Sequence, residues 1–339
     1  METLKVGIIG YGWVASAHIE AINACAAAEV AAVYSSREIS PGEGIAVFSD
    51  LDAMLADESI DVISICSYPN QHKAQAIAAA KAGKHLIIEK PLALSMADCR
   101  EIEQAVADAG VQVCVCFECR FSSQFLTTKA VIDDGLLGDI HYGEVDYYHG
   151  IGPWYGQFRW NTTRENGGSS LLSAGCHAMD ALLLCMGSEV ESVTSSATGS
   201  KNADFASYEY PTTSVTIVNF ADGRVGKVAS SIDCLQPYYF HTHLVGSEGS
   251  LLDNRFHSTK LGGLNKDNWS ELSMKMLDSG DVSDHPYETQ FGAFFDALGR
   301  GEAMPLTSLA DAMRSFEVIF AADLSAQEKR KVELAELRG

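Results

Sequence analysis

The chain lacks three features that would mark common classes of protein. Its apolar runs stay far below the ~20 residues that cross a bilayer, so we expect no membrane partner. Basic residues are few, because 24 Lys and Arg stand against 45 Asp and Glu, a net charge of −21. A nucleic-acid surface needs clustered Lys and Arg, so that class of partner is excluded as well. The nine cysteines form no paired framework, which favours reduced thiols and a cytoplasmic protein.

The chain is long enough for about two domains, at 339 residues with 47% apolar and 20% charged residues. The first predicted strand begins within a few residues of the start, so we expect no targeting peptide. Strands and helices alternate up to about residue 120, which predicts a parallel, doubly wound sheet. The strands are expected at 4–9, 30–34, 62–66, 85–88 and 111–117, and the helices at 13–22, 50–56, 74–82 and 96–109.

After residue 120 the pattern changes. A strand at 140–148 precedes a loop rich in Gly and Trp and an apolar helix at 170–186. Four stretches that alternate polar and apolar residues then predict antiparallel strands of one sheet, at 192–198, 214–220, 225–232 and 240–245. Further helices are expected at 124–134, 287–298 and 309–325. We therefore predict a doubly wound α/β domain at 1–120 and a second α/β domain at 121–339.

The first strand leads directly into Gly10-Tyr-Gly12-Trp-Val-Ala15 and then a helix. This is the dinucleotide fingerprint with Ala in its third position. Gly10 permits the tight turn, Gly12 lets backbone amides approach a pyrophosphate, and Ala15 keeps the helix close to the strand. The position after a strand and before a helix makes the motif specific.

The second strand ends in Ser35-Ser36-Arg37. An acidic residue normally lies here and binds the ribose hydroxyls of NAD. Two hydroxyls and an arginine suit a 2′-phosphate instead, so the pattern favours NADP over NAD. The alternative is that Arg37 points into solvent.

The strand at 85–88 ends in Glu89-Lys90-Pro91. Ligands of an open parallel sheet bind at the carboxyl ends of its strands. A lysine held there loses part of its solvation, and a neighbouring cation lowers its pKa toward a range useful for acid–base chemistry. The alternative is an ordinary surface turn.

Ser173, His177 and Asp180 stand at i, i+4 and i+7 of the apolar helix and are expected to share one face. A single helical histidine is more often a core residue. The polar stripe on an otherwise apolar helix, preceded by Gly167-Gly168, favours a site. Cys114, Cys116 and Cys119 lack a second ligand pair at zinc spacing, so we expect buried thiols and no metal.

Four motifs together resemble one family in their order and spacing: Gly10–Ala15, Ser67–His72, Gly83–His85 with Glu89–Pro91, and Gly167–Asp180. They are similar to the Gfo/Idh/MocA oxidoreductases, of glucose–fructose oxidoreductase and inositol dehydrogenase type, and the likeness covers essentially the whole chain. The resemblance implies a Rossmann domain and a larger α/β domain whose open, mostly antiparallel sheet mediates homodimers or homotetramers. It also implies hydride transfer between NAD(P) and a ring hydroxyl or ketone of a sugar, glycoside or polyol.

The resemblance further implies roles at matching positions. Lys90 would bind near the nicotinamide and the reacting oxygen, and His177 would transfer the proton. Further residues expected along the cofactor are Gly10, Gly12, Trp13, Val14, Ser35, Ser36, Arg37, Ser67, Asn70, His72 and Glu89. Candidate substrate contacts are Glu118, Arg120, Tyr148, His149, Trp160, Ser173 and His177.

Two positions depart from the family pattern. Many members carry Asp where this chain has Ser173, and a carboxylate there would raise the pKa of His177. Many also carry Asn where this chain has Glu118. Both changes bear on the substrate and on the direction of the reaction.

Three functions remain open: a sugar or polyol dehydrogenase, a reductase of a non-sugar carbonyl or diol, and a non-catalytic NAD(P)-binding regulator. Retention of Lys90 and His177 speaks against the regulator, which needs neither. The aromatic and polar segment 146–160 favours the first, because rings and hydroxyl-binding groups hold sugars. The alternative for this segment is a packed interface loop.

Overall fold

The computed structural model describes residues 3–265 and 267–338. The chain forms two compact units. The first unit runs to Glu118 and also takes in Val282–Met313, and the second comprises Cys119–Asp281 and the chain from Arg314. The sequence analysis placed Val282–Met313 in the second domain, whereas its contacts group it with the first unit.

The first unit holds a six-stranded parallel sheet in the order β3-β2-β1-β4-β5-β6. The order reverses at β1, as in the Rossmann fold, and the predicted doubly wound sheet is confirmed. The strands are β1 Leu4–Ile9, β2 Ala28–Tyr34, β3 Ala46–Phe48, β4 Val62–Ile65, β5 His85–Ile88 and β6 Val113–Val115. The helices are α1 Trp13–Ala24, α2 Leu51–Leu55, α3 Pro69–Lys81, α4 Met96–Ala109 and α9 Tyr287–Arg300, with 3₁₀ turns at Glu118–Phe121 and Val282–Asp284.

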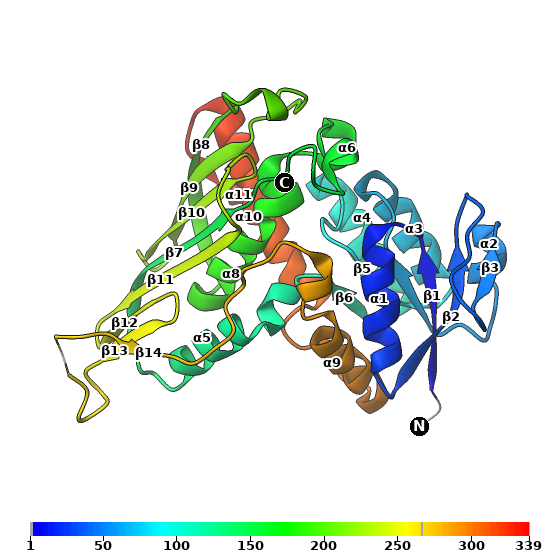
Figure 1. The fold of residues 1–339 in the computed structure, drawn as a ribbon, viewed down its shortest axis with the longest axis horizontal. Coiled ribbons are helices and arrows are strands. Elements are labelled where there is room, and N and C mark those ends of the chain that lie inside the picture. The colour runs from blue at the N-terminus through cyan, green and yellow to red at the C-terminus, as the bar shows by residue number, and fades with distance from the viewer. Residues whose placement is uncertain (1–2, 266, 339) are drawn as a thin grey trace. The chain divides into compact units, whose positions relative to one another are not determined.

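Right-handed crossovers run in opposite directions from β1, so α1 and the pair α3 and α4 cover opposite faces of the sheet. In Figure 1, α1 packs beside α9 and α3 beside α4. The helix α9 supplies buried phenylalanines, Phe291, Phe294 and Phe295. The segment Val282–Met313, which returns to the first unit late in the sequence, therefore adds α9 to the helix layer formed by α1.

Helix α3 begins at Pro69, five residues before the predicted start at residue 74. Proline fits the first position of a helix because its fixed φ suits the helix. The N–H that proline lacks would have no partner within the helix at this position, so no hydrogen bond is lost. Asn70 and His72 consequently lie in the first turn of α3 and not in the connection before it.

The second unit holds a nine-stranded sheet in the order β14-β13-β12-β11-β7-β10-β9-β8-β15. Its pairs are antiparallel except β7 with β10, so the predicted mostly antiparallel sheet is confirmed. The strands are β7 Ile140–Tyr148, β8 Val190–Thr198, β9 Thr213–Phe220, β10 Val225–Ser231, β11 Tyr239–Gly246, β12 Gly249–Leu252, β13 Arg255–Ser258, β14 Ser270–Glu271 and β15 Val332–Glu333.

Helices cover one face of this sheet, with α8 packed on β7 and β10 and beside α5 (Figure 1). The opposite face exposes Val215, Ile217 and Tyr239. The helices are α5 Ser123–Asp133, α6 Phe158–Asn161, α7 Arg164–Gly167, α8 Cys176–Met186, α10 Leu309–Glu328 and α11 Ala335–Arg338, with a 3₁₀ turn at Ala203–Phe205.

The predicted helix at 170–186 is divided. Leu171–Gly175 form a π-helical turn that leads into α8. Ser173 lies in this turn whereas His177 and Asp180 lie in α8, so the α-helical spacing from which one shared face was predicted does not hold for Ser173. By length and composition, Arg164–Met186 is apolar enough to cross a membrane. However, 89% of its most apolar stretch is buried inside the protein, as in a core helix.

Gly175 lets this turn approach β10. A Cβ at Gly175 would lie 2.2 Å from Ser230 Oγ and 2.5 Å from Ser230 Cβ. We expect Gly175→Ala to lower the free energy of unfolding by about 1–3 kcal/mol, the usual cost of overpacking. Urea unfolding followed by circular dichroism measures this change.

Gly199→Ala is the matched control, since nothing lies within 4 Å of a Cβ at that exposed position. Equal stability of the Gly175 and Gly199 variants would contradict the close packing of the π-helical turn on β10.

Candidate functional site

A cavity of about 460 Å³ lies at the carboxyl ends of the parallel strands in the first unit. Its size is that of an ordinary small-molecule site. Six predicted cofactor residues line it, namely Gly10, Gly12, Ser35, Ser36, Arg37 and Ser67. Tyr11, Tyr68, Gln71 and Gln75 also line it and were missed. Gln71 and Gln75 lie one helical turn apart on α3, a spacing that could have revealed them.

The glycines of the fingerprint shape the wall of this cavity. Gly10 has φ +90, and a Cβ there would lie 3.0 Å from the backbone of Ser67. Gly12 precedes α1 with no side-chain cap, and nothing lies within 4 Å of a Cβ at this residue. Open space in front of uncapped helix amides suits a phosphate. The residues present therefore fit a dinucleotide.

Trp13 and Val14 occupy the first turn of α1; Trp13 is 38% exposed and Val14 is half-buried. Ser35 is buried, and its hydroxyl accepts a hydrogen bond from the Arg37 amide at 3.1 Å. Ser36 and Arg37 are exposed on the cavity wall.

His72 is buried within α3 and does not line the cavity. Its Nδ1 lies 2.8 Å from the Pro91 carbonyl and its Nε2 lies 3.1 Å from the Ser67 carbonyl. Burial lowers the pKa of His72, and a neutral ring donates to one of these two oxygens. His72 thus connects the loops after β4 and β5. Asn70 lies in the same helical turn and is exposed.

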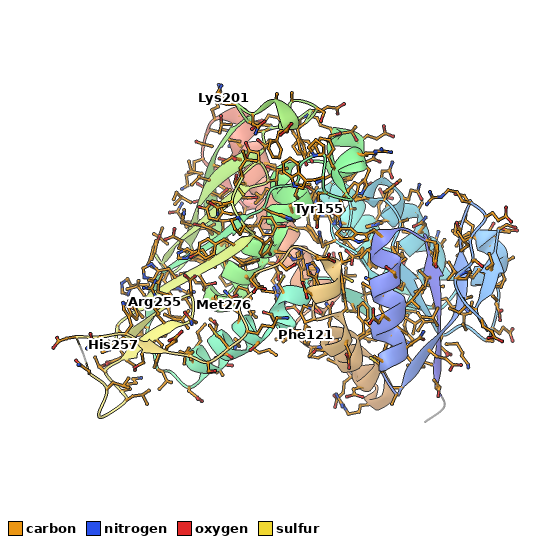
Figure 2. The ribbon with its side chains drawn as sticks, viewed as in Figure 1. Phe121, Tyr155, Lys201, Arg255, His257 and Met276 are labelled. Carbon is orange, nitrogen blue, oxygen red and sulfur yellow. The ribbon has the colours of Figure 1, made fainter. Side chains whose placement is uncertain are left out.

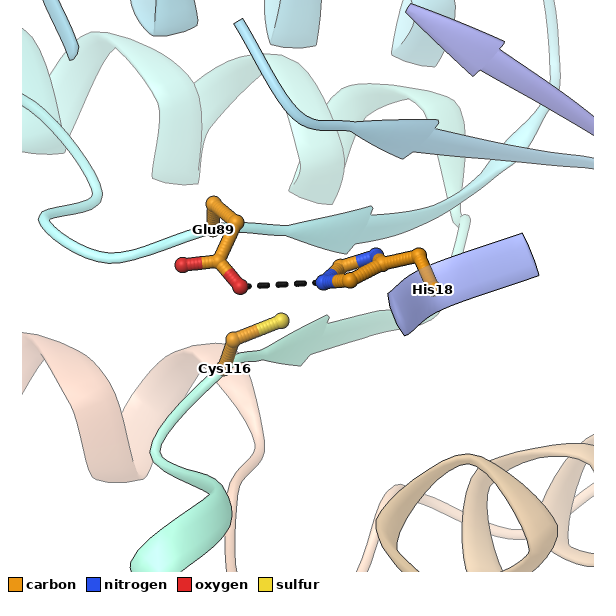
Figure 3. Close-up of side chains that lie close together, drawn as sticks. All are labelled: His18, Glu89 and Cys116. Carbon is orange, nitrogen blue, oxygen red and sulfur yellow. Dashed lines mark hydrogen bonds and ion pairs between the residues drawn. The ribbon is translucent and has the colours of Figure 1, made fainter. Parts of the chain in front are cut away.

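Glu89, at the end of β5, is the centre of a buried polar cluster (Figure 3). Its Oε1 lies 2.9 Å from His18 Nε2 of α1 and accepts a hydrogen bond from the Tyr287 hydroxyl at 2.7 Å. Its Oε2 accepts from the Lys90 amide at 3.1 Å. His18 Nδ1 lies 2.8 Å from Ser64 Oγ. Glu89 therefore joins α1, β5 and α9 and is only 6% exposed.

Burial works to raise the pKa of Glu89, but the hydrogen bond and charge of His18 outweigh it and the pKa is lowered. Burial works to lower the pKa of His18, but Cys66 and Glu89 raise it above the usual 6.5. Both shifts favour a buried carboxylate–imidazolium pair. Glu89 was predicted as a cofactor residue, and the structure places it in this interior pair.

Lys90 follows Glu89 and is half-buried. Glu118, a predicted substrate contact, is fully buried, with its Oε1 3.0 Å from Nδ1 of His285. The sequence analysis missed His285, which comes from the returning segment. No local sequence pattern could have predicted this contact, because Glu118 and His285 are far apart in the chain.

In the second unit, His177 is the second residue of α8 and is 4% exposed. Its ring stacks at 28° on Tyr147, with centroids 6.4 Å apart. Ser173 is buried in the preceding π-helical turn. Local π-helical turns recur at functional sites because they change which side chains project from a helix.

An aromatic cluster adjoins His177. The Tyr147 hydroxyl lies 2.9 Å from His149 Nδ1, and the His149 ring meets Tyr155 and Tyr238 edge-on at 4.7 and 5.2 Å. Figure 2 labels Tyr155, whose hydroxyl donates to the Gly280 carbonyl at 2.6 Å. Tyr147 and Tyr238 were missed.

Tyr148 lies on the other face of the sheet. Its hydroxyl donates to Asp146 at 3.3 Å, and its ring stacks on Tyr239. Successive strand residues face opposite ways, so Tyr147 and not Tyr148 lies beside His177. Trp160 is half-buried in α6.

Arg120 forms a two-pronged ion pair with Asp180, at 2.6 and 2.7 Å, and Ser315 donates to the same carboxylate at 2.6 Å. Arg120 and Asp180 are 7% and 1% exposed. The pair connects α8 to the 3₁₀ turn that precedes α5, and Ser315 adds α10. The guanidinium predicted to contact substrate thus clamps the helix that carries His177.

The predicted burial of the three clustered thiols is confirmed. All nine cysteines are free, and Cys114, Cys116 and Cys119 are buried. Burial raises the pKa of the Cys116 thiol well above its usual range, which makes it a poor nucleophile.

Comparison with known proteins identifies the class. Residues 4–117 match the model of the oxidoreductase family with an NAD-binding Rossmann fold, and residues 125–252 match the model of the GFO/IDH/MocA C-terminal domain. The chain belongs to the GFO/IDH/MocA oxidoreductase family, and the resemblance drawn from its motifs is confirmed.

Among individual relatives, myo-inositol 2-dehydrogenase of Thermotoga maritima is 26% identical over 99% of this chain and 100% of that protein. The scyllo-inositol 2-dehydrogenase (NADP(+)) of Bacillus subtilis is 28% identical over 55% of this chain and 53% of that protein. A levoglucosan dehydrogenase solved with NADH and levoglucosan has the same fold, with a TM-score of 0.83 and 22% identity over 98% of this chain and 100% of that one.

The buried pair yields a stability prediction. Glu89→Gln keeps the shape but removes the charge, so we expect it to lower the free energy of unfolding by about 3–5 kcal/mol, the usual cost of leaving one buried partner unpaired. Folding raises the pKa of His18, so this residue stabilises the fold fully below about pH 6.5, and the stabilisation is lost as the pH rises through the pKa of His18 in the folded protein. Folding lowers the pKa of Glu89, so this residue stabilises the fold fully above about pH 4.5, and the stabilisation is lost as the pH falls through the pKa of Glu89 in the folded protein.

The loss of stability in Glu89→Gln should therefore be greatest between about pH 4.5 and about pH 6.5, as measured by urea unfolding at several pH values. Lys73→Ala is the control, because it removes an exposed ion pair with Asp98 of the same unit and should change stability little. A loss for Glu89→Gln as small as that of the control would show that the pair is not charged.

Proposed function

We propose that this chain transfers a hydride between NAD(P) and a ring hydroxyl or ketone of a polyol or sugar. The observation that carries the proposal is the end-to-end similarity to myo-inositol 2-dehydrogenase of Thermotoga maritima. The shared fold of levoglucosan dehydrogenase agrees with a substrate rich in ring hydroxyls. The aromatic cluster beside His177 supplies rings of the kind that stack on sugar faces.

The dinucleotide would be held by the residues of the first-unit cavity. The open space before α1 would take the pyrophosphate, and Ser35, Ser36 and Arg37 would face the adenosine ribose. When bound, the nicotinamide accepts or returns the hydride. The arginine and the lack of an acidic residue favour NADP.

Proton transfer is assigned to His177. A secondary hydroxyl loses hydride only as its proton is accepted, so a group that titrates near neutrality must reach that oxygen, and imidazole has an unperturbed pKa of about 6.5. Packing against Tyr147 fixes the ring. Lys90 is assigned to the same oxygen, where an ammonium stabilises developing negative charge.

The quaternary state and the compartment are proposed as well. Exposed Val215, Ile217 and Tyr239 on the open sheet face support a homodimer or homotetramer formed through that face. Nine free cysteines support a reducing cytoplasm.

A substrate screen tests the proposed activity. Inositols, free hexoses and levoglucosan would be offered with NAD or NADP while reduced nicotinamide is followed by absorbance. Oxidation of at least one ring polyol supports the proposal. Turnover only with non-sugar carbonyls or diols would favour a different reductase. Tight dinucleotide binding without turnover of any substrate class would favour a regulator.

The cofactor assignment makes a separate prediction. We expect NADP to bind at least as tightly as NAD, and Arg37→Ala to weaken NADP binding by about 10–100-fold, the worth of a charge-assisted hydrogen bond, while NAD binding stays nearly constant. Fluorescence titration measures both affinities. Arg300→Ala, at an exposed arginine of the same unit, is the control. A preference for NAD that survives Arg37→Ala would overturn the assignment.

The catalytic assignment predicts that His177→Ala and Lys90→Ala each lower kcat by about 10²–10⁴-fold, the usual worth of positioned proton transfer. Dinucleotide binding should largely survive in the His177 variant, because that residue lies outside the cofactor unit. Ser173→Asp should raise the pKa of His177, so the acid limb of the pH–rate profile should move to higher pH.

Steady-state kinetics across pH measure these effects, with His141→Ala at an exposed histidine of the same unit as the control. Near-full turnover of His177→Ala would make His177 a core residue.

A further inference from the structure

The open face of the second-unit sheet carries a polar cluster that the proposed reaction does not use. Glu144 and Asp146 alternate along β7, with Gly143 turned the other way against Met186 of α8. On β11, His241 and His243 stand opposite Asp146 and Glu144 respectively. The sequence separates these strands by almost a hundred residues, and their pairing alone brings the side chains together.

Two histidines two residues apart on one strand point the same way. The strand opposite adds a carboxylate, since Glu144 pairs directly with His243. One ligand atom from each of Glu144, His241 and His243 lies within 4.8 Å of the other two. Ligands about 2.1 Å from a tetrahedral zinc lie roughly 3.4 Å apart, so small side-chain rotations would close the cluster.

The second nitrogen of His241 is already engaged. Its Nδ1 lies 3.0 Å from Asp253 Oδ1 and 3.0 Å from the Tyr239 hydroxyl, and Tyr239 donates to Asp253 at 2.8 Å. Histidines that bind metals commonly donate their other N–H to a carboxylate, which fixes the ring and strengthens it as a ligand. Asp253 thus leaves Nε2 of His241 for a metal.

Charge favours a cation at this place. Lys227 of β10 lies 2.6 Å from Glu144 Oε1 and 2.7 Å from Asp146 Oδ2, while β11 lies on the other side of β7. With Asp253, three carboxylates face a single ammonium. Lys227 donates to Glu144 Oε1, and the Tyr142 hydroxyl donates to Glu144 Oε2 at 3.0 Å. A carboxylate has about four acceptor positions, so these two contacts leave others for a metal.

We propose that Glu144, His241 and His243 form a binding site for a zinc-type divalent cation. Two imidazoles and one carboxylate suit zinc and the neighbouring late transition metals better than Mg²⁺ or Ca²⁺, which prefer oxygen ligands. Three protein ligands leave the fourth position to water. The sequence analysis expected no metal because it considered only cysteines close together in the chain.

The test uses the purified full-length protein, in the assembly it forms, after treatment with a chelator. Zn²⁺ is titrated against a chromophoric chelator, and Co²⁺ is added as a spectroscopic probe of four-coordinate geometry. We expect one strong site per chain and visible Co²⁺ bands. His243→Asn and Glu144→Gln should each weaken Zn²⁺ binding by about 100-fold or more, and Asp253→Asn by about 10–100-fold.

His257→Asn is the matched control. His257 lies on β13 opposite Ser250 of β12, which pairs with Val245 of β11. It therefore occupies the same sheet face, two strands away from β11. This variant should bind Zn²⁺ as the wild type does. Glu144→Gln preserves shape and decides the matter if His243→Asn unfolds the protein.

Absence of a stoichiometric site would overturn the proposal. It would equally fail if Glu144→Gln and His243→Asn both bound Zn²⁺ as the wild type does, or if His257→Asn lost as much affinity as they do. These outcomes are independent of dehydrogenase activity, because every readout is metal binding.

Discussion

The buried contact between Glu89 and His18 is the constraint on which the cofactor unit depends. A charged pair in an apolar interior is stable only in good geometry, because its desolvation is otherwise uncompensated. Glu89 meets that condition with hydrogen bonds from His18, Tyr287 and the Lys90 amide. The helix α1, which follows Gly10 and Gly12 of the fingerprint, is thereby tied to the strand end that carries Lys90. The Glu-Lys-Pro motif combines an interior anchor with the lysine that follows it.

The second unit fixes its histidine by different means. Gly175 lets the π-helical turn lie against β10, Asp180 clamps α8 through Arg120 and Ser315, and Tyr147 packs on the imidazole. The packing of the π-helical turn, the clamp on α8 and the stacked Tyr147 ring thus all contribute to the orientation of His177.

Much of the fold could be predicted, because its signals are local. The strands predicted at 4–9, 85–88 and 140–148 each follow from a few neighbouring residues, and all three formed where expected. The π-helical turn was missed because apolar composition does not distinguish it from α-helix. The contacts of His18 with Glu89 and of Glu118 with His285, and the pairing of His243 with Glu144, were missed because tertiary structure creates them. Tyr147 could have been chosen over Tyr148 from strand alternation alone.

The protonation state of His18 tests this account most directly. Ring-nitrogen chemical shifts of ¹⁵N-histidine-labelled protein, with the His18 signal assigned by its loss in His18→Gln, would be followed across pH. The account predicts that His18 remains an imidazolium well above pH 6.5 and loses its proton only at a clearly higher pH. A neutral ring at pH 6.5 and above would contradict a charged Glu89–His18 pair and, with it, the anchor assigned to the Glu-Lys-Pro motif.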